Sequence, residues 1–285
     1  MTLSATNVRP PEMPLPMLPV PMRIRRRVKE TADTFTIELE PPDGTFAFEP
    51  GQFNMLYVFG VGEVPISISG DVSRRDVLVH TIRDVGTVTH ALGRLKKGDW
   101  VGVRGPYGRG WPMKIAKGRD VILAAGGIGL APLRPAIREV LDNRDDYGRV
   151  VVFYGARTPG DLLYPKEVVK WRARLDAKVS VTVDRADRTW HGNVGVITQL
   201  VSAARTDASR TVAMVCGPEI MMHYMRIHLA KLGIADEAIY VSMERNMKCA
   251  IGRCGHCQYG GDFICKDGPV FTFAEVESRF RIRSL

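Results

Sequence analysis

The sequence predicts an antiparallel β-barrel, followed by a Rossmann-like α/β domain with a parallel sheet and a small C-terminal loop segment. Three observations predict this arrangement. Short β-like stretches separated by Gly and Asp fill the first part, strand and helix patterns alternate after Gly118, and four of the five cysteines fall within residues 249–265. The length of 285 residues corresponds to about two domains at roughly 150 residues each.

The barrel is predicted from closely spaced turns. Residues 23–40 alternate in polarity as strands do, and the Pro41-Pro42-Asp43-Gly44 run ends them. One helix is expected at residues 87–95. Further strands are expected at residues 53–59, 66–69, 77–82 and 100–104. Short strands at this spacing favour a small antiparallel barrel.

The second half alternates strands with helices, which predicts a parallel sheet with right-handed crossovers. The strands are expected at residues 121–125, 150–154, 178–183 and 211–215, and the helices at 132–141, 165–175 and 219–232. From Ser242 onward the chain is expected to be loop-like. The predicted boundaries are a Pro-rich arm at 1–21, the barrel at 22–114, the α/β domain at 115–240 and the C-terminal segment at 241–285.

Composition excludes several classes of protein. Hydrophobic residues make up 45% of the chain and charged residues 25%, which is typical of a folded globular protein. No apolar run approaches the roughly 18 residues of a membrane span, and the Pro-rich start lacks the pattern of a secretory signal, so we expect a cytoplasmic protein. The arm is expected to be disordered or to lie against a partner.

The net charge of +9 is scattered, with local clusters only at residues 23–27 and 279–283. Neither cluster has interleaved aromatic residues or a nucleic-acid-binding motif, so we expect no nucleic-acid partner. A basic surface suits phosphorylated cofactors and an acidic protein partner equally well.

The cysteines give the strongest chemical signal. Their spacing is C-x4-C-x2-C-x7-C, and the first three match the plant-type run that ligates a 2Fe-2S cluster. The nearby glycines let the chain wrap such a cluster closely. A structural zinc site is the alternative, although it commonly uses two C-x2-C pairs and only one is present. His256 is expected to be an exposed or orienting residue. The four expected ligands are Cys249, Cys254, Cys257 and Cys265.

A glycine-rich turn follows the predicted strand at residues 121–125 and opens a helix. Gly126, Gly127 and Gly129 stand where backbone N–H groups and a helix N-terminus hold a diphosphate, and Pro132 suits the first helical turn. A plain strand-to-helix turn is the alternative. Pro132 replaces the third glycine of the common dinucleotide fingerprint, which indicates a different nucleotide-binding family.

Three further motifs are weaker by themselves. Cys216-Gly217-Pro218 ends a second apolar strand of the parallel sheet, where ligands usually bind, although a buried inert thiol explains it equally well. A barrel strand carries Pro65-Ile66-Ser67-Ile68-Ser69, and Gly86-Thr87-Val88-Thr89 opens the barrel helix. The hydroxyl groups of the latter could bind phosphate or only cap the helix.

The order of these motifs resembles the ferredoxin-NADP reductase superfamily, in the branch with a C-terminal 2Fe-2S domain. Within it, the chain is most similar to the gamma (diaphorase) subunits of cytosolic NiFe hydrogenases, or sulfhydrogenases. The electron-transfer subunit of dihydroorotate dehydrogenase and the flavin subunit of anaerobic sulfite reductase are related. The resemblance covers about residues 22–275, and residues 243–249 with the Gly-x-Cys-Gly-x-Cys run are its most specific part.

The resemblance implies a role for each motif. The flavin ring and ribityl chain of FAD would lie against Pro65, Ile66, Ser67 and Ser69, and its diphosphate against Gly86, Thr87 and Thr89. Much of the superfamily has an Arg before that Pro. Here Val64 stands in its place, and Arg83 is the candidate to supply the charge. NAD(P) would lie against Gly126, Gly127, Gly129, Pro132, Cys216, Gly217 and Pro218, with Arg157 and Thr158 placed to read a 2′-phosphate.

The resemblance also implies an electron chain of NAD(P)H, FAD, 2Fe-2S cluster and external partner, running in either direction. NAD(P)H gives a two-electron hydride and a cluster accepts one electron, so a flavin must connect them. No acid–base residue is required; Cys216 could tune the nicotinamide site. The expected partners are the catalytic and iron–sulfur subunits of a NiFe hydrogenase, with a dihydroorotate dehydrogenase core or a sulfite reductase as alternatives. A zinc-stabilised nucleotide-binding scaffold is the alternative of another class.

Overall fold

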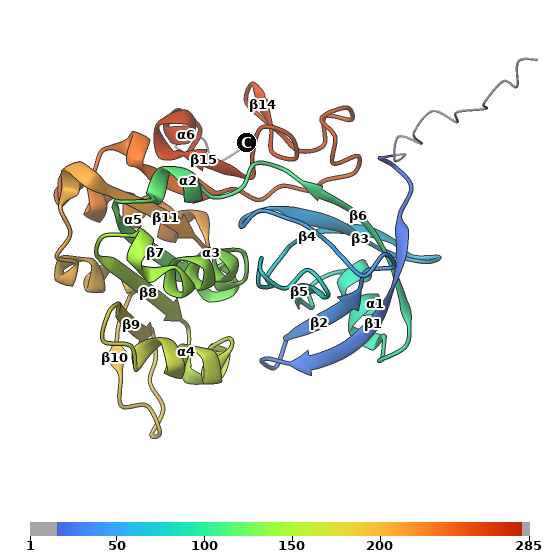
Figure 1. Cartoon of the computed structure of the whole chain (residues 1–285), viewed down its shortest axis with the longest axis horizontal. Coiled ribbons are helices and arrows are strands. Elements are labelled where there is room, and N and C mark those ends of the chain that lie inside the picture. The colour runs from blue at the N-terminus through green and yellow to red at the C-terminus, as the bar shows by residue number, and fades with distance from the viewer. Residues whose placement is uncertain (1–15, 281–285) are drawn as a thin grey trace, which may run out of the picture.

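The computed structural model describes residues 16–280, and two sheets of different kind organise most of them. Figure 1 shows the antiparallel sheet of the N-terminal part beside the largely parallel sheet of the later part, with the C-terminal segment lying along both. The predicted combination of an antiparallel barrel, a Rossmann-like domain and a small C-terminal segment is therefore confirmed. No helix within residues 16–280 is long and apolar enough to cross a membrane.

The first sheet has the strand order β4-β3-β6-β1-β2-β5, with neighbouring strands antiparallel. Its strands are β1 (Val20–Lys29), β2 (Thr34–Glu40), β3 (Phe53–Val58), β4 (Gly62–Ser67), β5 (Leu78–Arg83) and β6 (Trp100–Tyr107). The two edge strands meet where Ile68 bridges to His80 and the Ser69 amide donates to the Val79 carbonyl at 2.9 Å, which closes the barrel. Helix α1 (Thr87–Arg94) buries Leu92 in the barrel core.

The second sheet has the order β10-β9-β8-β7-β11-β12-β15, and only β15 runs antiparallel. Its strands are β7 (Asp120–Gly126), β8 (Val150–Ala156), β9 (Lys178–Val183), β10 (Asn193–Val194), β11 (Thr211–Cys216), β12 (Ile239–Ser242) and β15 (Val270–Thr272). The α-helices after the barrel are α2 (Met113–Ala116), α3 (Leu130–Asp142), α4 (Pro165–Arg172), α5 (Glu219–Lys231) and α6 (Phe273–Phe280). Short 3-10 turns are Gly127–Gly129, Arg144–Asp146, Pro159–Asp161, Ile197–Ala203, Ala208–Arg210 and Asp236–Ala238.

Helices cover both faces of the parallel sheet. Successive side chains of a strand point to opposite faces, so Leu123 of β7 packs with α3 while Ala124 packs on the face covered by α5. Strands buried on both faces read as continuous apolar runs, which is why residues 121–125 and 150–154 stand out in the sequence. Trp111 joins the two domains, because its indole Nε1 donates to the Pro132 carbonyl at 2.9 Å.

The direction of winding reverses beside β7. The chain proceeds from β7 to β8 and β9 on one side, and then returns to place β11 and β12 on the other. In open α/β sheets, ligands bind at the carboxyl ends of the strands where such a reversal occurs. The topology therefore points to the loops that follow β7 and β11.

The prediction that the chain is loop-like from Ser242 onward is wrong for its last part. A hairpin of β13 (Gln258–Tyr259) and β14 (Asp262–Phe263) lies within it, β15 extends the large sheet and α6 follows. These strands have two or three residues each, too few to show an alternating pattern, and β15 is stabilised by its pairing with β12. Residues 1–15 of the predicted arm and residues 281–283 of the second basic cluster lie outside the described residues.

Candidate functional site

A cavity of about 900 Å³ lies at the carboxyl ends of the central parallel strands. It is bordered by the turn after β7, the end of β8, the start of α5 and the segment after β12. Among the predicted site residues, those lining it are Arg83, Gly126, Gly127, Gly129, Arg157, Gly217 and Pro218. The sequence motifs are far apart in the chain, and the reversal of the winding brings them to one place.

The turn after β7 requires glycine for two separate reasons. Gly127 has φ +55°, in the left-handed region that other residues adopt at a cost. A Cβ atom added to Gly129 would lie 2.4 Å from the carbonyl oxygen of Cys216, because the turn packs directly against the end of β11. This close approach brings the N-termini of α3 and α5 to the same cavity, where backbone N–H groups and helix dipoles favour an anionic group.

Cys216 and Pro132 lie behind the cavity rather than on its lining. Cys216 is buried at the end of β11, and burial raises the pKa of its thiol, so the thiol stays protonated at neutral pH. Its neighbour Ser242 lines the cavity instead. Pro132 is buried in the first turn of α3, as predicted, and its carbonyl accepts the Trp111 hydrogen bond.

A smaller cavity of about 310 Å³ adjoins the first and contains the predicted Thr158. Arg83 and Arg157 line both cavities, and Arg185 adds a third guanidinium to the smaller one. Arg83 is paired with Asp33 at 2.8 Å, and the Thr158 hydroxyl donates to Asp161 at 2.7 Å. Arg157, which follows β8, and Arg185, which lies near the end of β9, are both exposed, and neither has such a carboxylate partner within residues 16–280.

The predicted flavin residues of the barrel separate into two groups. Pro65, Ile66 and Ser67 are half-buried on the edge strand β4, where they remain accessible. Ser69 is fully buried, and its carbonyl accepts a hydrogen bond of 3.0 Å from Arg134 of α3. Ser69 thus contributes to the contact between the two domains.

At the start of α1, Gly86 borders open space and the side chain of Thr89 caps the helix. A Cβ added to Gly86 would meet nothing nearer than the Thr89 hydroxyl at 4.0 Å, and Thr87 is exposed. The Thr89 hydroxyl is buried and accepts from the Gly86 amide at 2.8 Å. The start of the helix therefore leaves Gly86 and Thr87 accessible, while Thr89 acts as the cap.

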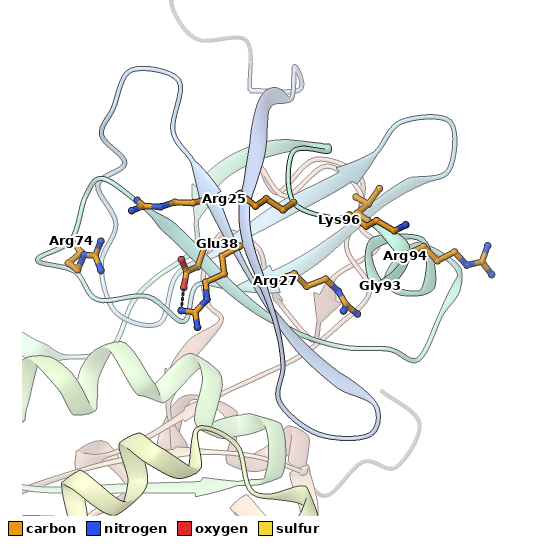
Figure 2. Close-up of a pocket in the computed structure, with 10 residues that line it drawn as sticks. Arg25, Arg27, Glu38, Arg74, Gly93, Arg94 and Lys96 are labelled. Carbon is orange, nitrogen blue, oxygen red and sulfur yellow. Dashed lines mark hydrogen bonds and ion pairs between the residues drawn. The ribbon is translucent and has the colours of Figure 1, made fainter.

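A separate basic hollow of about 810 Å³ lies on the outside of the barrel. Figure 2 shows the side chains that line it. Its cations come from β1, from the end of α1 and the turn after it, and from the loop before β5. Arg26 pairs with Glu38 at 3.3 Å. It shares no lining residue with either cavity described above and is therefore separate from both. Its cationic residues are Arg25, Arg26, Arg27, Arg74, Arg94, Lys96 and Lys97.

The four predicted cysteines lie together in residues 249–265, which we call the cysteine loop. The thiols contact in two pairs, Cys249 with Cys254 and Cys257 with Cys265. Cys254 is exposed and the other three are buried, while His256 is exposed. Within the described residues no three Cys, His, Asp or Glu side chains converge on one metal-ion position. Two pairs suit a two-iron cluster better than a single tetrahedral zinc ion.

Backbone N–H groups point at the sulfur atoms. The Cys249 sulfur accepts from Arg253 at 3.3 Å and Cys254 at 3.4 Å, and the Cys265 sulfur accepts from Gly252 at 3.2 Å. Burial works to raise the pKa of Cys249, but these donors lower it overall, whereas burial raises the pKa of Cys265. Donors to the sulfurs are the kind of contact that stabilises thiolate ligands of an iron–sulfur cluster.

Comparison with known proteins identifies each part of the chain. Residues 19–111 match the family model described as oxidoreductase FAD-binding domain. Residues 123–226 match the model described as oxidoreductase NAD-binding domain. Residues 244–277 match the model described as iron–sulfur cluster binding domain of dihydroorotate dehydrogenase B. The gamma subunit of sulfhydrogenase 1 from Pyrococcus furiosus is 41% identical over 258 residues, covering 87% of this chain and 88% of that protein. The chain belongs to the iron–sulfur branch of the ferredoxin-NADP reductase superfamily.

Other members of this branch are similar over most of their length. The probable electron-transfer subunit of dihydroorotate dehydrogenase B from Pyrococcus furiosus is 38% identical over 79% of this chain and 80% of that protein. A chain of the NADH-dependent reduced ferredoxin-NADP oxidoreductase has a TM-score of 0.73 and 26% identity, covering 92% of this chain and 94% of that chain. The chain is thus an oxidoreductase subunit with FAD, NAD and iron–sulfur cluster-binding domains, and the zinc scaffold alternative is wrong.

Sequence reasoning missed several residues of the cavity. Ser242 and Glu244 line it because Ser242 ends β12, a four-residue strand beside β11, and Glu244 follows that strand. Asp184 lines it at the end of β9, and Arg185 lines the smaller cavity. The signal for Asp184 and Arg185 was available, because they directly follow a predicted strand of the parallel sheet.

Proposed function

We propose that the chain is an NAD(P)H-linked diaphorase subunit that passes electrons between NAD(P)(H), FAD and a 2Fe-2S cluster, to or from a NiFe hydrogenase partner. The observation that carries it is the continuity of the two sites. Glu244 lines the nucleotide cavity, and five residues later Cys249 begins the cysteine loop. Five residues span at most roughly 18 Å, so the two ends of the electron path are necessarily near each other.

The protein residues bind and orient. The turn after β7 and the start of α5 supply backbone N–H groups for the dinucleotide diphosphate, and Arg157 is the candidate for a 2′-phosphate. Gly86 and Thr87 are the candidates for the FAD diphosphate, and the edge strand β4 for the flavin ring. When bound, FAD supplies the conversion of a two-electron hydride into single electrons for the cluster. Cys216 keeps its proton, which suits packing below the nicotinamide site rather than acid–base chemistry.

A hydrogenase partner is favoured by similarity. The gamma subunit of sulfhydrogenase 1 from Pyrococcus furiosus is 41% identical over 87% of this chain, against 38% over 79% for the dihydroorotate dehydrogenase subunit of the same organism. The gamma subunit of sulfhydrogenase 2 is 36% identical over 82% of this chain. The second candidate is therefore the electron-transfer subunit of a dihydroorotate dehydrogenase. We place the protein in the cytoplasm, since a reducing compartment preserves free thiolate ligands.

An anaerobic spectroscopic titration tests the electron chain. The purified protein is expected to show flavin and iron–sulfur absorption that bleaches on addition of NADPH or NADH, with about two iron atoms per chain. Arg157→Ala is expected to weaken NADPH binding about tenfold and leave NADH unchanged if NADPH is the donor. A protein that binds nucleotide without any spectral change would refute the diaphorase function.

Co-expression with candidate partners tests the assignment of the complex. The chain is produced with the catalytic and iron–sulfur subunits of a NiFe hydrogenase from the same genome, and H2-dependent reduction of NAD(P)+ is measured. A complex that forms and couples the two reactions supports the proposal. Coupling only to dihydroorotate oxidation, with a dihydroorotate dehydrogenase core, would instead establish the second candidate.

A further inference from the structure

Arg104 of β6 is a buried cation that reaches from the barrel to the cysteine loop. Its side chain is 1% exposed. It forms a two-point ion pair with Glu63 of β4, with Nη2 at 2.8 Å and 2.9 Å from the two carboxylate oxygens and Nε at 3.0 Å. A planar guanidinium matches a carboxylate in this way, whereas a lysine does not.

The remaining donors of Arg104 reach the lead into the cysteine loop. Nη2 donates to the Lys248 carbonyl at 3.0 Å and Nη1 to the carbonyl of Cys249 at 3.1 Å. Nη1 also contacts the Pro16 carbonyl at 2.9 Å and the Tyr107 hydroxyl at 3.2 Å. The side chain therefore binds the backbone of Cys249, the first predicted cluster ligand, which is 145 residues away in the sequence.

Stability alone does not explain the arrangement. Arg104 loses its hydration on burial while Glu63 keeps 24% of its side chain exposed, and an ion pair of this kind gains little over well-packed apolar residues. The pair does fix one geometry, since the guanidinium can satisfy Glu63 and both carbonyls only when β4, β6 and Cys249 lie as they do here. Glu63 lies two residues before Pro65 on the strand predicted to face the flavin.

We propose that Arg104 and Glu63 form a positioning pair that fixes the Cys249 end of the iron–sulfur cluster against strand β4 and sets the reduction potential of the cluster. The proposal rests on the cluster of the proposed function. A buried cation beside a ligand favours the reduced cluster, which carries one more negative charge, and a nearby anion opposes it. The two members of the pair therefore act on the potential with opposite signs.

Redox titration of the cluster, followed by electron paramagnetic resonance, tests this pair. Arg104→Gln is expected to disfavour cluster reduction about tenfold, which is about 59 mV for a one-electron couple. Glu63→Gln is expected to shift the potential in the opposite direction, and the double variant to return toward the wild-type value. Potentials that stay at the wild-type value, or that move in the same direction in both single variants, would overturn the proposal.

Arg109→Gln is the matched control. Arg109 also joins the first half of the chain to the C-terminal segment, through the Val270 carbonyl at 2.6 Å and an ion pair of 2.9 Å with Glu275. None of its hydrogen bonds within residues 16–280 reaches a cysteine residue. Its replacement is expected to leave the cluster potential unchanged, so a shift equal to that of Arg104→Gln would also count against the pair.

If Arg104→Gln does not retain its cluster, its reduction potential cannot be measured, and Arg104→Lys then tests the positioning role. Lysine keeps the charge but loses the planar fork, so we expect a near-wild-type potential and faster hydrogen exchange at residues 248–250. Unchanged exchange there would overturn the positioning role. Wild-type protein without iron would refute the proposed function itself, whereas iron-loaded wild type with unmoved variant potentials overturns only the role of the pair.

Discussion

The nucleotide cavity and the cysteine loop are built in opposite ways. The cavity is made of backbone at the ends of long buried strands and helices, and its shape follows from the sheet that carries it. The cysteine loop contains only a hairpin of two-residue strands, and side chains of other parts of the molecule hold it, Arg104 of the barrel among them.

This difference separates two sources of stability. The strands below the cavity bury apolar side chains on both faces, and this burial is present without a bound nucleotide. The cysteine loop turns several backbone N–H groups toward sulfur atoms, so ligation of a cluster must contribute to its folding. We therefore expect the cavity to keep its structure without a bound nucleotide, and the cysteine loop to need a bound cluster to keep its structure.

Cys257→Ser is expected to have the largest effect, since it removes one of the four predicted ligands, a buried one. Iron content should fall to background, while the thermal unfolding of the α/β domain should change little. Cys216→Ala is the control, because Cys216 is also a buried thiol but lies in β11 outside the loop. Iron and sulfide assays measure the outcome, and loss of iron from the control would break the distinction between the two regions.

Removal of iron by a chelator sharpens the same comparison without a mutation. Amide hydrogen exchange in residues 249–265 should accelerate at least about tenfold, because these backbone groups lose the order that ligation provides. Exchange in β7, β8 and β11 should stay slow. Equal acceleration in those strands would mean that the cluster stabilises the whole chain.

The barrel, like the cavity, has stability that does not depend on a bound ligand, and His80 in its core makes this stability depend on pH. Burial lowers the pKa of this fully buried imidazole from 6.5 to about 4, and the ring bonds the Ser67 carbonyl and Asn54. Between pH 6.5 and about 4 the unfolded state binds the proton and the folded state does not. Stability should therefore fall as pH decreases through this window, by about 3 kcal/mol in all.

Denaturant unfolding at several pH values checks this expectation. His80→Gln can keep hydrogen bonds to its neighbours but has no proton to gain, so its stability should vary less across the same window. An equally steep dependence in the variant would assign the acid sensitivity to other groups. Hydrogen exchange measured alongside would report whether the cysteine loop follows the barrel.

Gly129→Ala tests whether the cavity depends on close backbone packing. The added Cβ meets the Cys216 carbonyl, so we expect a loss of about 2 kcal/mol in the free energy of unfolding and weaker nucleotide binding. Gly118→Ala is the matched control: its φ is +72° and open space surrounds it, so only the backbone strain of about 1 kcal/mol applies. Equal losses in both variants would show that packing at Gly129 is not limiting.

Most of the fold was predictable because its signals are local. The strands β7, β8, β9 and β11 follow from apolar runs, and the turn after β7 from its glycines. The strands that were missed, β10, β12, β13, β14 and β15, have two to four residues and are held by pairing with neighbours. For the same reason no local pattern placed Ser242, the last residue of β12, or Glu244, in the lead into the cysteines, at the cavity.

By itself the sequence determined which chemical groups are present and how near they lie along the chain. Short spacings such as C-x4-C-x2-C keep these residues near each other in any fold, since a few residues span a limited distance. The tertiary structure decided which groups meet across the chain: Arg104 with Cys249, Arg134 with Ser69, and Arg83 with Asp33. Those contacts depend on strand register and on the packing of one domain against another, and no local pattern records either.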